Sequence, residues 1–339
     1  MSLKEIAQMT GVSVSTVSRV LNNTSATCAS PAVKDRIWEA ARQTGYVANE
    51  TARSLRRSKE LQEEALRISI ILARITSLEE EPFFAELLRN LEEELYLQKA
   101  AVDQVVFAEE SVSHHPENSD GIILLGRCSE KLFSQIRKKQ PNLVGIWRNP
   151  VDFLVDEVIC DGRKAAETAM EYLISLGHRK IAYIGDCSNE SRYVGYCNAL
   201  INKGLPLVYD RVKQTGQTKK EAVRAFSELL LGKKQETTDF SAVLCANDIS
   251  AIGVLETLAG EKKKLRDQIS VISIDNIEEA ENVKPYLTTI NIPRKEMAHM
   301  AVQLLKDRID HGHSEYTRIE FPCRIVQRGS CRELRIYRT

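Results

Sequence analysis

The feature that most constrains the fold is an alternation of short apolar runs and amphipathic stretches, which begins at Leu66 and continues almost to the end of the chain. The runs LRISIILA, GIILL, KIAYIG and SVISI are predominantly apolar, as in strands that are covered on both faces. Helical stretches separate them, which is typical of parallel sheets joined by crossover helices. The alternation predicts about ten strands or more, too many for one comfortable open sheet, so we expect two doubly wound α/β halves. The expected strands include 66–73, 102–108, 121–125, 143–147, 158–160, 180–185, 208–213, 242–245 and 270–274, with further strands after residue 310. The expected helices are 83–97, 129–140, 163–176, 191–203, 219–230, 249–258 and 295–309.

The start of the chain, LKEIAQMTGVSVSTVSRVLN, predicts two short helices joined by a tight turn. Leu3 and Ile6 give the first an apolar side, Gly11 permits a positive φ, and Ser13 is a suitable N-cap for the second. Hydroxyls and amides bind phosphates, and an arginine can bind guanine bidentately. This is the helix-turn-helix pattern, although a helical hairpin with a solvated polar face is the alternative. The outward face of the second helix carries Ser15, Thr16, Ser18, Arg19 and Asn22.

A third helix is expected from Pro31, which Ser30 precedes as N-cap, to about Gly45. The three helices form a small all-α head. The basic segment YVANETARSLRRSK follows it, with Leu55 exposed among arginines. It is either a flexible linker or a segment that becomes helical on DNA and wedges Leu55 into the minor groove, with Arg53 and its neighbours on phosphates.

The charge distribution supports a DNA-binding head on a different kind of body. The net charge of the 339 residues is zero, yet residues 1–60 hold 9 Lys and Arg against 5 Asp and Glu. The head segment is therefore basic and the remainder mildly acidic, as expected for a DNA module attached to another domain.

Other classes of protein lack support in the sequence. No apolar run is long enough for a membrane helix, and the N-terminus lacks the apolar core of a signal peptide. The eight cysteines are scattered with no CxxC pair, which favours reduced thiols in the cytoplasm. A metal site is disfavoured, because no histidine has a partner at ligand spacing except the adjacent His114 and His115 in a polar loop. There is no GxSxG, HExxH, P-loop or dinucleotide fingerprint, so an enzyme is disfavoured; we expect no cofactor and no metal.

Five motifs together resemble the lactose/galactose-repressor (LacI/GalR) family of bacterial transcription regulators. They are GVSVSTVSRVLN, GYVANETARSL, YLISLGHRKIAYIG, VLCANDISAIGVL, and SVISIDN with PYLTTINIP, and they cover nearly the whole chain. The resemblance implies a helix-turn-helix head over 1–46, a hinge over 47–60 and a periplasmic-binding-protein-like body over 61–339. The implied subdomains of the body are 61–159 plus 293–319 and 160–292 plus 320–339.

The resemblance also implies which residues bind DNA. Val14, Ser15 and Arg19 match the positions that contact bases, and Leu55 matches the minor-groove lever in TARSL, where the family commonly has VARSL. The family binds palindromic operators as homodimers or dimers of dimers, and no leucine heptad follows residue 310, which favours a dimer. The complete expected set is Leu3, Ser13, Val14, Ser15, Thr16, Arg19, Asn22, Asn49, Arg53 and Leu55.

An effector cleft between the subdomains is likewise implied by the resemblance. An arginine, carboxylates and an amide with flanking aromatics suit a hydroxyl-rich ring such as a sugar. Asp275 and Asn247 have the alternative of capping helices, Arg192 of a surface ion pair, and the phenylalanines of packing in the core. The expected ligand residues are Phe83, Phe84, Trp147, Arg148, Arg192, Asn247, Asp248 and Asp275.

The resulting hypothesis is a cytoplasmic, nucleoid-associated repressor of a sugar-utilisation operon. A small ligand, for example a galactoside, would change its operator affinity by moving the two subdomains. The alternative is a regulator controlled by a protein partner or a corepressor, without a sugar inducer.

Overall fold

The computed structural model describes residues 3–21, 29–44, 65–75, 77–108, 119–188, 190–230, 238–262, 265 and 267–334. The chain divides into two compact units, unit 1 with Met1–Ile159 and Arg294–Ile319, and unit 2 with Cys160–Pro293 and Glu320–Thr339. It therefore passes between the units three times, and the second passage lies one residue later than the sequence predicts. No helix of the described residues is long and apolar enough to cross a membrane.

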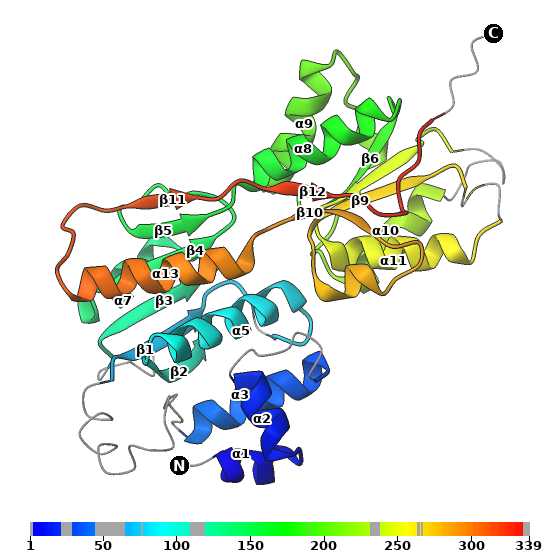
Figure 1. Ribbon diagram of the computed structural model, residues 1–339. Helices are drawn as coiled ribbons and strands as arrows, with labels where there is room; N and C mark the ends of the chain where they lie inside the picture. Colours follow the sequence, from blue (N-terminus) through cyan, green and yellow to red (C-terminus); the bar gives the residue numbers. More distant parts are fainter. Residues whose placement is uncertain are drawn as a thin grey trace. The chain divides into compact units, whose positions relative to one another are not determined.

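Unit 1 contains a six-stranded sheet in the order β11-β5-β4-β3-β1-β2, in which β1 to β5 pair in parallel (Figure 1). The helix α13 packs directly on β3, because a Cβ on Gly121 would lie 2.8 Å from the side chain of Leu305. The strands are β1 (Arg67–Leu72), β2 (Ala101–Phe107), β3 (Gly121–Leu125), β4 (Leu143–Trp147), β5 (Asp156–Ile159) and β11 (Arg318–Glu320), and the helices are α5 (Pro82–Leu97), α7 (Glu130–Lys139) and α13 (Arg294–Ile309).

Unit 2 repeats this architecture in the order β12-β10-β9-β8-β6-β7, with β12 antiparallel to β10 (Figure 1). The helices α8 and α9 pack closely, because a Cβ on Gly195 would lie 2.3 Å from the carbonyl oxygen of Arg163. The strands are β6 (Ile181–Gly185), β7 (Val212–Gln214), β8 (Ala242–Cys245), β9 (Ser270–Asp275), β10 (Thr288–Asn291) and β12 (Arg324–Val326), the α-helices are α8 (Gly162–Ser175), α9 (Ser191–Asn202), α10 (Lys219–Leu230) and α11 (Asp248–Ala259), and the 3-10 helices are η1 (Tyr209–Arg211) and η2 (Glu278–Glu281).

One predicted strand, 208–213, is wrong in its first half. The structure has the 3-10 turn η1 there, and β7 begins only at Val212. The Arg211 N–H donates to the carbonyl of Val208 at 3.0 Å, and β7 is an edge strand that offers pairing on one side only. A local hydrogen bond therefore replaces strand pairing at this edge.

Each sheet has one point at which the strand order reverses. In unit 1, β1 lies between β3 and β2, and in unit 2, β6 lies between β8 and β7. Ligands of doubly wound sheets bind at such points, outside the carboxyl ends of the strands. The reversals direct attention to the residues that follow β1 and β3 in unit 1, and β6 and β8 in unit 2.

The structure confirms the three helices of the head: α1 (Leu3–Thr10), α2 (Val14–Leu21) and α3 (Pro31–Thr44). Gly11 has a φ of 68°, as the turn requires, and the Oγ of Ser13 accepts from the N–H of Thr16 at 3.1 Å to cap α2. The small core of the head includes Tyr96 of α5, whose ring meets Trp38 of α3 edge-on at 6.0 Å. The core of the head is thus completed by an aromatic side chain from outside its three helices, Tyr96 of α5.

Candidate DNA-binding surface and effector site

The outward face of α2 is polar and accessible, as a DNA-reading surface requires. Ser13, Ser15 and Arg19 are exposed and Val14 is 40% exposed, whereas Val17, Val20 and Leu21 are buried. The hydroxyl of Ser13 lies 2.8 Å from those of Ser15 and Thr16, so that three hydroxyl groups gather at the start of the helix. When the N-terminus of such a helix enters the major groove, its hydroxyls can bind phosphates and its guanidinium can bind base edges.

Not every expected DNA contact lies on this face. Leu3 is half-buried and packs against the core of the head, because it lies on the apolar side of α1, and its DNA contact stays a prediction. Four other expected contacts, Asn22, Asn49, Arg53 and Leu55, lie outside the described residues.

The central side chain of the candidate effector site is Arg192, at the start of α9 in unit 2. It is only 1% exposed. Its Nε donates to the Glu190 carboxylate at 2.9 Å, one Nη to the carbonyl of Ala246 at 2.6 Å, and the other Nη to the side-chain oxygen of Gln217 at 2.6 Å. Burial alone would lower the pKa of Arg192, but the adjacent Glu190 carboxylate more than offsets this and raises it, so the guanidinium stays charged. The alternative of a surface ion pair is wrong for this residue.

Asn247 lies beside Arg192. It is the second residue after the end of β8 and follows Ala246, whose carbonyl Arg192 binds. Its side-chain oxygen accepts from the N–H of Ser250 at 3.0 Å, which makes it the N-cap of α11. Its amide nitrogen donates to the carbonyl of Gln217 at 3.0 Å. The capping interpretation is correct, and the residue also holds Gln217, whose φ is 68°. Gln217 and Glu190 were not identified from the sequence, since no local motif distinguishes them from ordinary loop residues.

Asp248 supports the site from inside unit 2. It is fully buried and accepts from the hydroxyls of Ser273 and Thr289, each at 2.5 Å, and from the N–H of Ile277 at 2.9 Å. Burial, followed by the nearby Asp275 carboxylate, raises the pKa of Asp248 to about 7. Its contacts join α11 to the ends of β9 and β10, so it positions the site and is not available for direct ligand binding as expected.

Asp275 ends β9 in an unusual backbone conformation. Its φ is 133°, its side chain is 2% exposed, and its charge acts on both Arg192 and Asp248. A non-glycine residue rarely adopts such a φ, and residues that do so cluster at functional sites. Arg192, Asn247 and Asp248 follow β6 and β8, which are neighbours at the reversal point of the sheet of unit 2, and Asp275 ends the next strand, β9.

Unit 1 gathers a different set of groups at its own reversal point. Phe83 and Phe84 begin α5 with ring centroids 5.3 Å apart, and the Arg148 guanidinium lies 4.1 Å from the Phe83 centroid. A Cβ on Gly126, just after β3, would lie 3.4 Å from the Phe84 ring. Arg294 also faces Phe83, at 5.6 Å, and was not identified from the sequence. Both phenylalanines are buried, as the core alternative predicted, but they pack at the carboxyl edge of the sheet.

Trp147 does not join this set. Its ring lies in the core of unit 1 near Phe153, 3% exposed, and its Nε1 donates to the carboxylate of Glu157. The reason is strand parity, because the ring covers Gly145 two residues earlier on the same face of β4. The side chain of Arg148, the next residue, leaves the core and reaches the ring of Phe83.

Both segments match known families. Residues 2–49 match the family described as bacterial regulatory proteins, lacI family, and residues 170–331 match a periplasmic binding protein-like domain. The chain is 29% identical to the probable HTH-type transcriptional repressor ExuR of Bacillus subtilis, with 98% of this chain and 99% of that protein covered.

Solved structures show the same fold. The CelR–cellobiose complex of a transcriptional regulator has a TM-score of 0.68 at 23% identity, with 98% of this chain and 100% of that chain covered. A LacI family regulator from Enterococcus faecium with bound ribose has a TM-score of 0.66 at 26% identity, with 79% and 100% covered. The chain thus joins a helix-turn-helix head of the lacI family to a periplasmic binding protein-like body, and over nearly its whole length it is similar to LacI-family transcriptional repressors.

Proposed function

We propose that the operator affinity of this repressor is controlled by a small polyhydroxylated ligand, a sugar, which the Arg192 cluster binds. The observation that carries the proposal is a buried, charged guanidinium with strained Asp275 beside it, at the reversal point of a doubly wound sheet. The same chain carries the exposed α2 face, so an input site and a DNA-reading surface are covalently joined.

The chemistry of the cluster fits hydroxyl groups. A guanidinium has five N–H donors, and the contacts of Arg192 to Glu190, Ala246 and Gln217 use three of them. Two N–H groups are left to donate to a ligand oxygen, and the Asp275 carboxylate accepts from a hydroxyl. Phe83 and Phe84 remain predicted ligand contacts, since aromatic rings suit the CH face of a sugar. The ribose bound to the Enterococcus faecium relative supports this ligand class.

On the DNA side, we propose that a homodimer binds a palindromic operator in the cytoplasm. Arg19 would contact a base, and Val14 and Ser15 would pack against neighbouring base edges. Asn22, Asn49, Arg53 and Leu55 remain predicted contacts, with Leu55 in the minor groove. A ligand that prefers one arrangement of the two units then changes operator affinity by its difference in affinity for the two arrangements.

The test begins with an operator selected from random duplex DNA by the full-length protein. Fluorescence anisotropy then measures its Kd with and without each member of a panel of pentoses, hexoses, uronic acids and galactosides. We expect at least one member to change the Kd by about fivefold or more, the usual range of allosteric coupling, and to raise the thermal midpoint of the protein.

Two variants separate the two halves of the proposal. Arg19→Ala should weaken specific operator binding and keep the thermal stabilisation by the active sugar, whereas Arg192→Lys should lose the stabilisation and keep operator binding. If no member of the panel changes the operator Kd or the thermal midpoint, the proposal of a sugar effector is refuted. If the Kd instead changes on addition of a protein purified from cell extract, regulation by a partner replaces it.

A further inference from the structure

Two of the three passages between the units run side by side. β5 and β11 are neighbours in the sheet of unit 1, and the N–H of Glu157 donates to the carbonyl of Thr317 at 2.9 Å (Figure 1). Unit 2 begins immediately after β5, at Cys160, and the chain re-enters it shortly before Cys323, between β11 and β12. Each of these two passages therefore carries a cysteine just inside unit 2.

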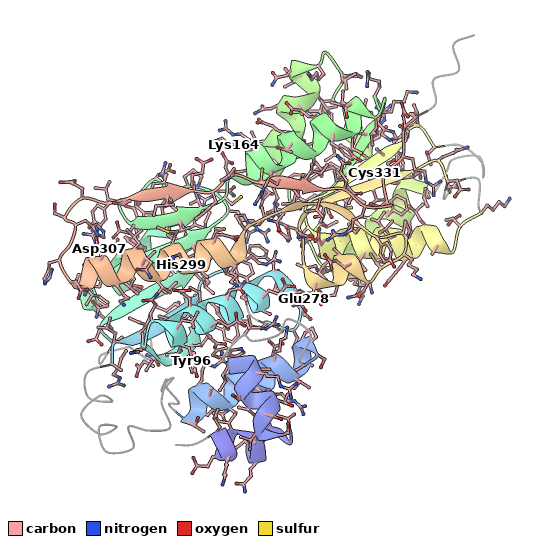
Figure 2. The ribbon with its side chains drawn as sticks, in the orientation of Figure 1. Tyr96, Lys164, Glu278, His299, Asp307 and Cys331 are labelled. Carbon is pink, nitrogen blue, oxygen red and sulfur yellow. The ribbon has the colours of Figure 1, made fainter. Side chains whose placement is uncertain are left out.

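The helix α8, which begins two residues after Cys160, contacts the returning segment. Lys164 Nζ lies 2.6 Å from the Glu320 carboxylate, and Figure 2 shows Lys164 at the start of α8 beside this segment. One turn further along α8, the hydroxyl of Thr168 lies 3.8 Å from the Sγ of Cys323. These contacts place Cys323 next to the first turns of α8, close to Cys160, which directly follows β5.

The two thiols interact directly and are unlike each other. Cys160 is fully buried, whereas Cys323 is half-buried. The thiol of Cys160 donates a hydrogen bond to the sulphur of Cys323, and this bond raises the pKa of Cys160. The same bond, with those from the Thr168 hydroxyl and a backbone N–H, lowers the pKa of Cys323 to about 7. This shift favours the thiolate of Cys323, the nucleophilic form of a cysteine.

The other described cysteines lack this activation. Burial raises the pKa of each of them, because no neighbouring group stabilises the thiolate enough to compensate. These cysteines are Cys128, Cys187, Cys197, Cys245 and Cys331. Cys323 is accordingly the one cysteine in the described part of the chain with a lowered pKa.

We propose that Cys323 and Cys160 form a hydroperoxide-sensitive thiol pair, which on oxidation becomes an intrachain disulfide that joins the first and last passages between the units. The bond itself is independent of the sugar proposal. Its consequence for regulation rests on the proposed function, because a cross-link between these passages restricts any rearrangement of the units that a ligand drives.

The chemistry proceeds in two balanced steps. The Cys323 thiolate attacks one oxygen of hydrogen peroxide, so that an S–O bond forms, the O–O bond breaks, and the departing hydroxide takes a proton to become water. The sulphur of Cys160 then attacks the sulfenic sulphur of Cys323. The S–S bond forms, the S–O bond breaks, and the thiol proton of Cys160 leaves with the hydroxide as a second water. Two thiols and one peroxide thus give one disulfide and two waters, and a thiol reductant reverses the change.

The first experiment identifies the bond. The full-length protein receives one equivalent of hydrogen peroxide, free thiols are alkylated, and a digest is analysed by mass spectrometry without reduction. We expect one dominant cross-link, between the peptides of Cys160 and Cys323. Cys160→Ser should prevent it and leave a sulfenic acid on Cys323 that dimedone traps, Cys323→Ser should prevent both products, and Cys187→Ser, the matched control, should change neither.

The second experiment measures the consequence in a way that does not depend on a ligand. The urea midpoint of unit 2, followed by circular dichroism, should rise on oxidation of the unmodified protein and stay unchanged on oxidation of Cys160→Ser. The proposal is overturned if dimedone labels Cys187 as readily as Cys323, or if the folded protein yields no cross-link. If the cross-link forms but no sugar changes the operator Kd, the proposal of a sugar effector is refuted and the proposal of the thiol pair is retained.

Discussion

Replacing Arg192 tests the architecture of the effector site most directly. In Arg192→Ala, three hydrogen bonds are lost and the Glu190 carboxylate, whose side chain is 2% exposed, remains buried without its cation. Breaking a buried ion pair by removing one partner costs about 3–5 kcal/mol, because the remaining charge stays buried without the opposite charge that compensated its desolvation. Typical domains have a total stability of about 5–15 kcal/mol, so unit 2 should become marginal.

The measurement has to separate the two units. Both tryptophans, Trp38 and Trp147, belong to unit 1, so tryptophan fluorescence reports only on that unit. Urea unfolding of Arg192→Ala should therefore show an earlier transition by circular dichroism and a nearly unchanged transition by fluorescence. Arg192→Lys keeps the charge but cannot bond three partners in a fork, and should cost about half as much.

A double variant completes the argument. If the penalty comes from the stranded Glu190 charge, Glu190→Gln with Arg192→Met should recover most of the stability lost in Arg192→Ala. A loss below about 1 kcal/mol in Arg192→Ala, the usual size of an exposed ion pair, would refute the buried network. An equal shift of the fluorescence transition would show that the units do not unfold separately.

Three further predictions concern the head and the buried carboxyl. Arg19→Ala should reduce discrimination between the selected operator and single-base variants by about 1–3 kcal/mol in anisotropy titrations, without changing thermal stability, since Arg19 is exposed; unchanged discrimination would contradict the base contact. Tyr96→Ala removes an aromatic ring from the core of the head and should destabilise the head by about 3 kcal/mol, seen as a red shift of Trp38 emission in a Trp147→Phe background; an unshifted spectrum would exclude the contact. The pKa of Asp248 in the folded protein is raised to about 7, so between about pH 4 and pH 7 the native state holds a proton that the unfolded state releases. The free energy of unfolding should therefore fall as pH rises through this range, by up to about 1.4 kcal/mol per pH unit. Asp248→Asn should lack this decline, and parallel stability curves for both proteins would contradict the assignment.

The sequence alone determined the class of fold and most of its elements, although not the short strand β10 or the bounds of β11 and β12. Apolar runs such as GIILL and SVISI form buried parallel strands because alternating crossover helices cover both faces, and this follows from local composition and spacing. The polar face of α2 was equally evident, because helical periodicity separates Arg19 from Val17 and Val20 without knowledge of any other element.

Only the tertiary structure decided what the individual side chains do. Trp147 and Arg148 are adjacent in sequence, yet strand parity places one in the core and the other against Phe83. Gln217 and Glu190 join the site because they meet Arg192 across the fold, and Cys160 meets Cys323 because two distant passages of the chain run together. A sequence shows a residue's local neighbours, whereas burial, pKa and reactivity depend on neighbours in space that chain topology brings together.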